Sequence, residues 1–75
     1  MNITEAEKAE CYLNWMNELE TIREEYERDL NNCINNTNSS KTEMESCVDY
    51  ATAKMEQKKV AAEQRLQECL GPQKR

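Results

Sequence analysis

The chain has 75 residues, of which 33% are charged, with a formal net charge of −5, one Gly, one Pro, no Phe and no His. A chain of this size forms one small domain whose hydrophobic core alone gives marginal stability, and its composition indicates long helices, not sheet. The acidic balance argues against a nucleic-acid partner, and no apolar run approaches the length needed for membrane insertion.

The first helix is predicted over about residues 4–34. Thr4 and Glu7 fit a capping box, in which each side chain accepts the backbone N–H of the other residue. From Cys11 to Cys33 the larger apolar residues follow steps of 4, 4, 3, 4, 4 and 3, an eleven-residue repeat that aligns them on one side of a nearly straight helix. These residues are Cys11, Trp15, Leu19, Ile22, Tyr26, Leu30 and Cys33.

A turn over residues 35–41 and a second helix over about residues 42–70 follow. The turn is rich in Asn, Ser and Thr, whose side chains compete with a helix for backbone hydrogen bonds. A second capping box begins at either Ser40 or Thr42, and the only glycine, Gly71, is expected to end the helix. The same steps recur on this helix, at Cys47, Ala51, Met55, Lys58, Ala62, Leu66 and Cys69.

The four cysteines lie symmetrically about this turn, so an antiparallel hairpin brings Cys11 to Cys69 and Cys33 to Cys47. A bridge from Cys11 to Cys33 would join residues roughly 33 Å apart on one helix, against the ~6 Å that a disulfide allows. The third connectivity needs parallel helices and a long return connection, which the turn could reach but which is uncommon for so short a link. We therefore predict a single domain, residues 1–75, that is an all-α antiparallel two-helix hairpin closed by the disulfides Cys11–Cys69 and Cys33–Cys47.

The two halves of the chain differ in charge. Residues 1–40 carry nine acidic and three basic side chains, whereas residues 41–75 carry six and seven. The difference favours packing of one helix against the other, although exposed ion pairs contribute only ~0–1 kcal/mol each. At the seam, Lys58 is expected to lay its methylenes over Ile22 while its ammonium group reaches water.

The residue inventory argues against catalysis and against metal or cofactor binding. Without His, the chain lacks the commonest general base and the histidine-activated nucleophiles. It has no glycine-rich phosphate loop, and its cysteines lack the C-x2-4-C spacing of zinc sites. We therefore expect no enzyme activity, no cofactor and no metal site.

Three N-x-[ST] sequons make Asn2, Asn35 and Asn38 candidate glycosylation sites. An Asn- and Ser-rich turn also produces sequons by chance, but paired cysteines belong in an oxidising compartment. Together they favour a secreted protein, with the mitochondrial intermembrane space as the alternative.

Two helices cannot enclose all the apolar side chains of this sequence, and exposed apolar surface often marks an interface. Trp15 suits the seam of the hairpin or a partner surface, and acidic residues of the first helix would steer a basic partner towards it. The same surface would serve a monomer or a homodimer. The candidate partner contacts are Tyr12, Trp15, Met16, Glu20, Glu24 and Glu27.

The run from Cys11 to Trp15, continuing through Tyr26 to Cys33, resembles the first part of the secreted insect domain named after the tsetse EP protein. The resemblance covers less than half of the chain, and the half from Cys47 onwards matches less well. It implies a secreted protein linked to gut, saliva or defence, with no established catalytic role.

The function expected from these observations is that of a small secreted non-enzymatic binding module that occupies an extracellular protein partner, of a host-defence type or of a salivary or gut inhibitor type. One alternative is a dimeric carrier of a small apolar ligand. The other is a structural helical hairpin of the mitochondrial intermembrane space.

Overall fold

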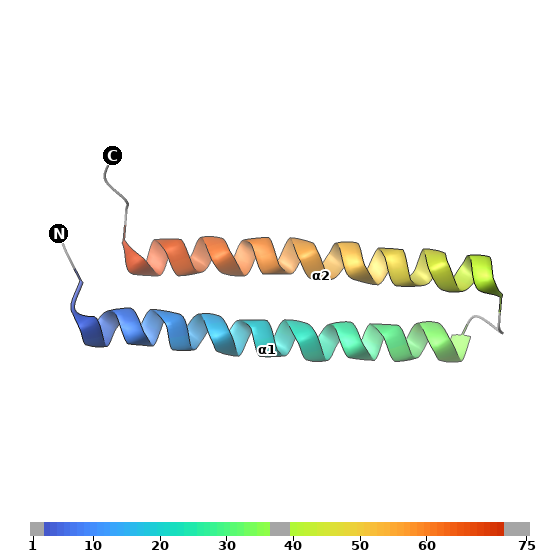
Figure 1. Ribbon diagram of the computed structural model, residues 1–75, viewed down its shortest axis with the longest axis horizontal. Coiled ribbons are helices and arrows are strands. Elements are labelled where there is room, and N and C mark those ends of the chain that lie inside the picture. The colour runs from blue at the N-terminus through green and yellow to red at the C-terminus, as the bar shows by residue number, and fades with distance from the viewer. Residues whose placement is uncertain (1–2, 37–39, 72–75) are drawn as a thin grey trace.

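The computed structural model describes residues 3–36 and 40–71. It consists of α1 (Glu5–Asn36) and α2 (Lys41–Leu70), which lie side by side and antiparallel (Figure 1). The predicted all-α hairpin is confirmed. Helix α1 ends two residues later than expected and α2 begins one residue earlier, because the turn residues at both edges adopt helical backbone.

Both helices begin at the capping residues that the sequence indicates. The Thr4 N–H donates to Glu7 Oε1 at 2.9 Å, and the Glu7 N–H donates to Thr4 Oγ1 at 3.1 Å, which completes the first capping box. On α2 the Glu43 N–H donates to Ser40 Oγ at 3.3 Å. Ser40, and not Thr42, is therefore the N-cap of α2.

Gly71 ends α2 in a backbone conformation that favours glycine. Its φ of 99° lies in the region that side chains with a Cβ atom rarely adopt. Its N–H donates to the carbonyl oxygen of Glu68 at 3.2 Å, so one of the last helix carbonyls is satisfied.

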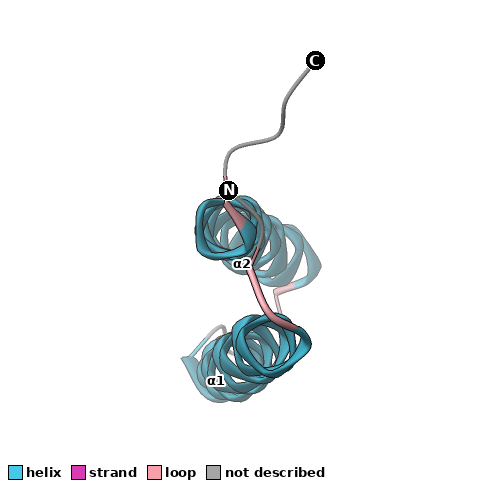
Figure 2. Cartoon of the chain, turned by 90° about the vertical axis from the view of Figure 1, so that its left-hand side faces the viewer, coloured by secondary structure: helices cyan, strands magenta, loops and turns pink. Residues whose placement is uncertain are grey.

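The hairpin is a single layer with a thin core. Its Cα atoms extend over 55 × 23 × 9 Å, and the described residues supply no third element over either side of the helix pair (Figure 2). Within the described residues neither helix is apolar enough to cross a membrane. The buried side chains are Cys11, Ile22, Cys33, Ala51, Ala62 and Leu66.

The two predicted rows, from Cys11 to Cys33 on α1 and from Cys47 to Cys69 on α2, form the seam between the helices. The residues of these two rows that are not buried are half-buried, except Cys69, which is exposed. Small residues of α2, such as Ala51 and Ala62, let the larger side chains of α1 approach closely. A hydrogen bond that the spacing did not predict joins Tyr26 Oη to Thr52 Oγ1 across the seam at 2.9 Å.

Two disulfides close the seam near its ends, and both predicted pairings are confirmed. Cys11 bonds to Cys69 and Cys33 to Cys47, each with 5.7 Å between the Cα atoms. The two bridges close loops of very different length, since their sequence separations are 58 and 14 residues.

The long loop predicts a larger role for the outer disulfide. Replacing Cys11 and Cys69 by Ser should lower the free energy of unfolding by about 4 kcal/mol, and replacing Cys33 and Cys47 by about 3 kcal/mol, because a longer closed loop restricts the unfolded chain more. Denaturant unfolding followed by circular dichroism measures both losses. A larger loss for the inner pair would contradict this explanation.

Candidate functional site

The seam divides the surface of the hairpin into two sides with different chemistry. On one side, which we call the ion-paired side, three acidic residues of α1 each bind a basic residue of α2. Arg65 Nε lies 2.7 Å from Glu18 Oε2, Lys58 Nζ lies 2.6 Å from Glu25 Oε1, and Lys54 Nζ lies 3.1 Å from Asp29 Oδ2.

These ion pairs follow from the helix spacing. Glu18, Glu25 and Asp29 are separated by seven and four residues, so they align along one edge of α1. The hydrogen bond from Lys58 lowers the pKa of Glu25, and the hydrogen bond to Asp29 raises the pKa of Lys54. The acidic residues of the first half and the basic residues of the second half thus partly neutralise each other within the hairpin.

Lys58 corrects one expectation. Its stem lines the seam beside Ile22, as predicted, but its ammonium group binds Glu25 and is not directed only to water. An open groove of about 540 Å³ runs along this side, with Ile22 and Ala61 between ion pairs on its rim. Because the charged groups around the groove already bind each other, this side offers little unsatisfied chemistry to a ligand.

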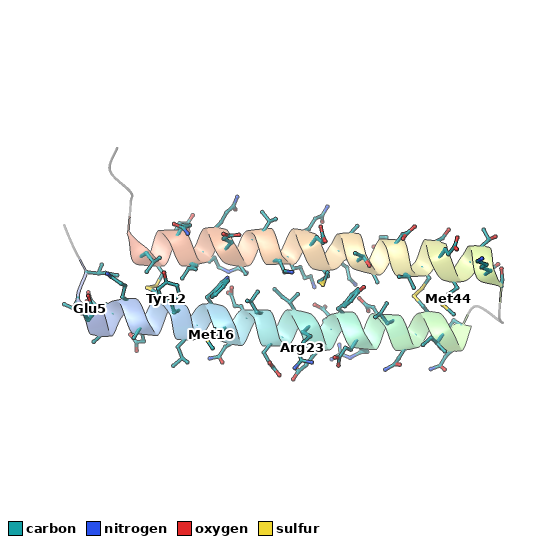
Figure 3. All side chains as sticks on the ribbon, in the orientation of Figure 1. Glu5, Tyr12, Met16, Arg23 and Met44 are labelled. Atoms are coloured by element: carbon teal, nitrogen blue, oxygen red, sulfur yellow. A yellow bond between two sulfur atoms is a disulfide. The ribbon has the colours of Figure 1, made fainter. Side chains whose placement is uncertain are left out.

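The other side, which we call the open side, carries exposed apolar residues. A groove of about 290 Å³ on this side is lined by Trp15, Leu19 and Val60 together with charged residues of α2. Tyr12 is 44% exposed and Met16 56% exposed, and they precede Arg23 along α1 (Figure 3). Helical spacing places them in one row with Leu19. We define the α1 stripe as Tyr12, Met16, Leu19, Arg23, Glu27, Leu30 and Ile34.

Trp15 belongs to the seam and presents only part of its ring to the surface. It is half-buried, and its ring meets that of Tyr12 edge to face, with 6.4 Å between centroids. Its Nε1 and the Glu18 Oε1 are buried without a hydrogen-bond partner among the described residues. Both residues line a hollow of about 210 Å³ beside the outer disulfide.

The acidic candidates do not form a bare acidic surface. Arg23 donates to Glu20 at 2.7 Å and to Glu27 at 2.9 Å, and these carboxylates raise the pKa of Arg23. Glu24 lies nine residues from Trp15, or about two and a half helical turns, and so projects from the opposite side of α1. The structure therefore brings Tyr12, Trp15 and Met16 together, flanked by Glu20 and Glu27, and separates Glu24 from them.

Of the three candidate glycosylation sites, one lies within the described residues. Asn35 is exposed in the last turn of α1, whereas Asn2 and Asn38 lie outside the described residues. Over residues 3–36 and 40–71 no group of three metal-binding side chains comes together.

Leu30 and Ile34 complete the open side but were not among the predicted contacts. Ile34 is 60% exposed and Leu30 half-buried. Both follow Met16 at helical spacing, and that spacing was the available signal. Because Arg23 and Glu27 interrupt the row, its apolar pattern is harder to recognise in the sequence than the pattern of the row that forms the seam.

Comparison with known protein families identifies a match over most of the chain. A family model described as "Protein of unknown function (DUF725)" matches residues 7–75, which include both disulfides. The match does not assign the chain to the secreted insect domain that its first half resembles. No curated protein and no solved structure matches the chain.

The ion pair of Glu25 predicts a pH-dependent stability. Because the folded state lowers the pKa of Glu25, the pair stabilises the hairpin above the ordinary carboxyl pKa, and this contribution is lost as the pH falls through the lowered value. Glu25→Gln should therefore lower the melting temperature at about pH 7 and have little effect at about pH 3.

Thermal unfolding of the parent and variant at both pH values measures this difference. Glu24→Gln is the matched control, because this neighbour is exposed and has no ion pair among the described residues. A destabilisation by Glu25→Gln that is equal at both pH values would show that lost packing, and not the ion pair, is responsible.

Proposed function

The chain belongs to the DUF725 family, and we propose that it is a small, secreted, non-enzymatic binding module whose open side occupies a protein partner. The proposal depends on one observation. The α1 stripe leaves Tyr12, Met16 and Ile34 between 44% and 60% exposed along one side of a single-layer hairpin.

The residue types of the open side suit a protein interface. Aromatic residues, Met and Arg are enriched at interface centres, and the stripe supplies Tyr12, Met16 and Arg23, with the edge of Trp15 beside them. Exposed apolar surface rimmed by polar residues often marks a site of protein–protein interaction.

The disulfides support binding because they hold the surface in place before a partner arrives. Cys11–Cys69 and Cys33–Cys47 lie on either side of the stripe's central residues. A surface that is already ordered loses less conformational entropy when it binds. The carboxylates of Glu20 and Glu27 outnumber the Arg23 guanidinium that they bind, so the rim retains an acidic bias that would steer a basic partner surface.

Secretion is part of the proposal. Two disulfides and no free cysteine among the described residues suit an oxidising compartment. The exposed position of Asn35 would leave a glycan at the end of the hairpin, away from the middle of the stripe.

A matched pair of variants tests the binding surface. Met16→Glu should abolish capture of the partner from extracellular fluid, because it places a carboxylate in the apolar row. Asn17→Glu introduces the same charge at the next residue of α1, which is also exposed but lines the groove of the ion-paired side. Affinity capture with oxidised protein, quantified by mass spectrometry, compares them. Equal capture by both variants would contradict a role for the open side.

Occupancy of the sequon tests whether the chain folds and is glycosylated as a secreted protein would be. Chain produced through the secretory pathway of eukaryotic cells should carry a glycan on Asn35, since the side chain is exposed and its sequon is intact. Intact mass before and after glycosidase treatment measures it, with Asn35→Gln as the control. A bare Asn35 with free thiols after passage through this pathway would contradict the proposed secretion.

A further inference from the structure

We propose that the partner of the open side is a second copy of this chain, packed α1 against α1 and α2 against α2 about a twofold axis. This inference rests on the proposed binding role of the open side and names its occupant. It starts from the symmetry of the α1 stripe, whose residues step by 4, 3, 4, 4, 3 and 4 with Arg23 at the centre.

The stripe is partly symmetric about Arg23: the residues seven and eleven positions away are apolar on both sides, whereas four positions away Leu19 precedes Arg23 and Glu27 follows it, so these two also face each other. Tyr12 and Ile34 lie eleven residues before and after Arg23, and Met16 and Leu30 lie seven residues before and after it. A second α1 laid antiparallel across Arg23 therefore places Tyr12 against Ile34 of the second copy and Met16 against Leu30 of the second copy. In such an isologous contact each apolar pair occurs twice.

The residues of α2 on the open side are complementary in charge to the same residues of the second copy when the two are related by this twofold axis. This row consists of Thr52, Glu56, Lys59 and Glu63, spaced by four, three and four residues, and the last three line the groove beside Trp15. Two antiparallel copies of this row place Glu56 against Lys59 of the second copy, and Lys59 against its Glu56. Charge complementarity of this kind fixes the register of an interface.

A single twofold axis can pass through the centres of both the α1 stripe and the row on α2, because the disulfides fix the register of the hairpin. Cys11–Cys69 and Cys33–Cys47 place Ile22 beside Lys58, and hence Arg23 at the level of Gln57. The row on α2 is centred between Gln57 and Lys58. The two centres thus coincide to within about one residue, or ~1.5 Å along the helix.

The charges near the axis are compatible with this packing. Two copies of Arg23 approach each other there, but each is bound by Glu20 and Glu27 of its own helix at 2.7 and 2.9 Å. Four carboxylates thus surround two guanidinium groups, which offsets the repulsion between the like charges. The ion-paired side is a poorer surface for a second copy, because its three basic and three acidic residues already bind each other.

Sedimentation equilibrium of the oxidised full chain tests the dimer. The parent should have twice the mass of one chain at micromolar concentration. Met16→Glu should raise the dissociation constant at least about 100-fold, because the substitution enters the interface twice. Asn17→Glu should change it less than about threefold, since Asn17 lies on the ion-paired side.

A charge exchange tests the twofold arrangement itself. Lys59→Glu should weaken the dimer roughly tenfold, because it sets Glu56 against a carboxylate of the second copy twice. Adding Glu56→Lys restores opposite charges and should return the constant to within about threefold of the parent value. Circular dichroism and a disulfide map of each variant show that the hairpin itself is intact.

The outcomes separate this inference from the proposed function. A parent chain that stays monomeric up to millimolar concentration overturns the dimer, while capture that depends on Met16 still supports a binding module with a different partner. A dimer that Asn17→Glu disrupts as strongly as Met16→Glu, or that the double exchange does not restore, overturns the proposed arrangement.

Discussion

The register between the two helices is the constraint on which the other features of this structure depend. Each helix carries its two cysteines with the same 22-residue spacing, so both disulfides form with the same 5.7 Å between Cα atoms and the helices do not slip along each other. An eleven-residue repeat keeps the apolar rows in line over this distance. Both the ion pairs of one side and the alignment of rows on the other require this register.

The thin core explains why covalent bonds were needed. Of the six buried side chains, two are disulfide cysteines and two are alanines, and these bury little apolar area compared with Leu or Ile. A two-helix layer of this kind has little stability without cross-links or assembly. The disulfides stabilise the hairpin while leaving one apolar row uncovered, so that stability of the single chain and exposure of a binding surface are compatible.

The sequence predicted the features that periodicity and chain geometry control. The seam followed from the spacing of its apolar residues, and the disulfide pairing followed from the short turn. The ion pairs were not predicted individually, because α1 carries many acidic side chains and the sequence alone does not show which of them lie beside Lys54, Lys58 and Arg65. Among the candidate contacts Tyr12 and Met16 lie together, whereas Glu24 lies on the opposite side, since adjacency in sequence does not define a helix face.

The contrast between the two sides indicates where selectivity would arise. On the ion-paired side the charges are already compensated, so a partner docking there would have to displace existing ion pairs and desolvate both members of each. On the open side Tyr12, Met16 and Ile34 are exposed to water, and covering them costs only the ordering of side chains on an already rigid scaffold. The apolar row would therefore supply most of the binding energy, while the charged row of α2, through Glu56 and Lys59, would select which partner and which register are accepted.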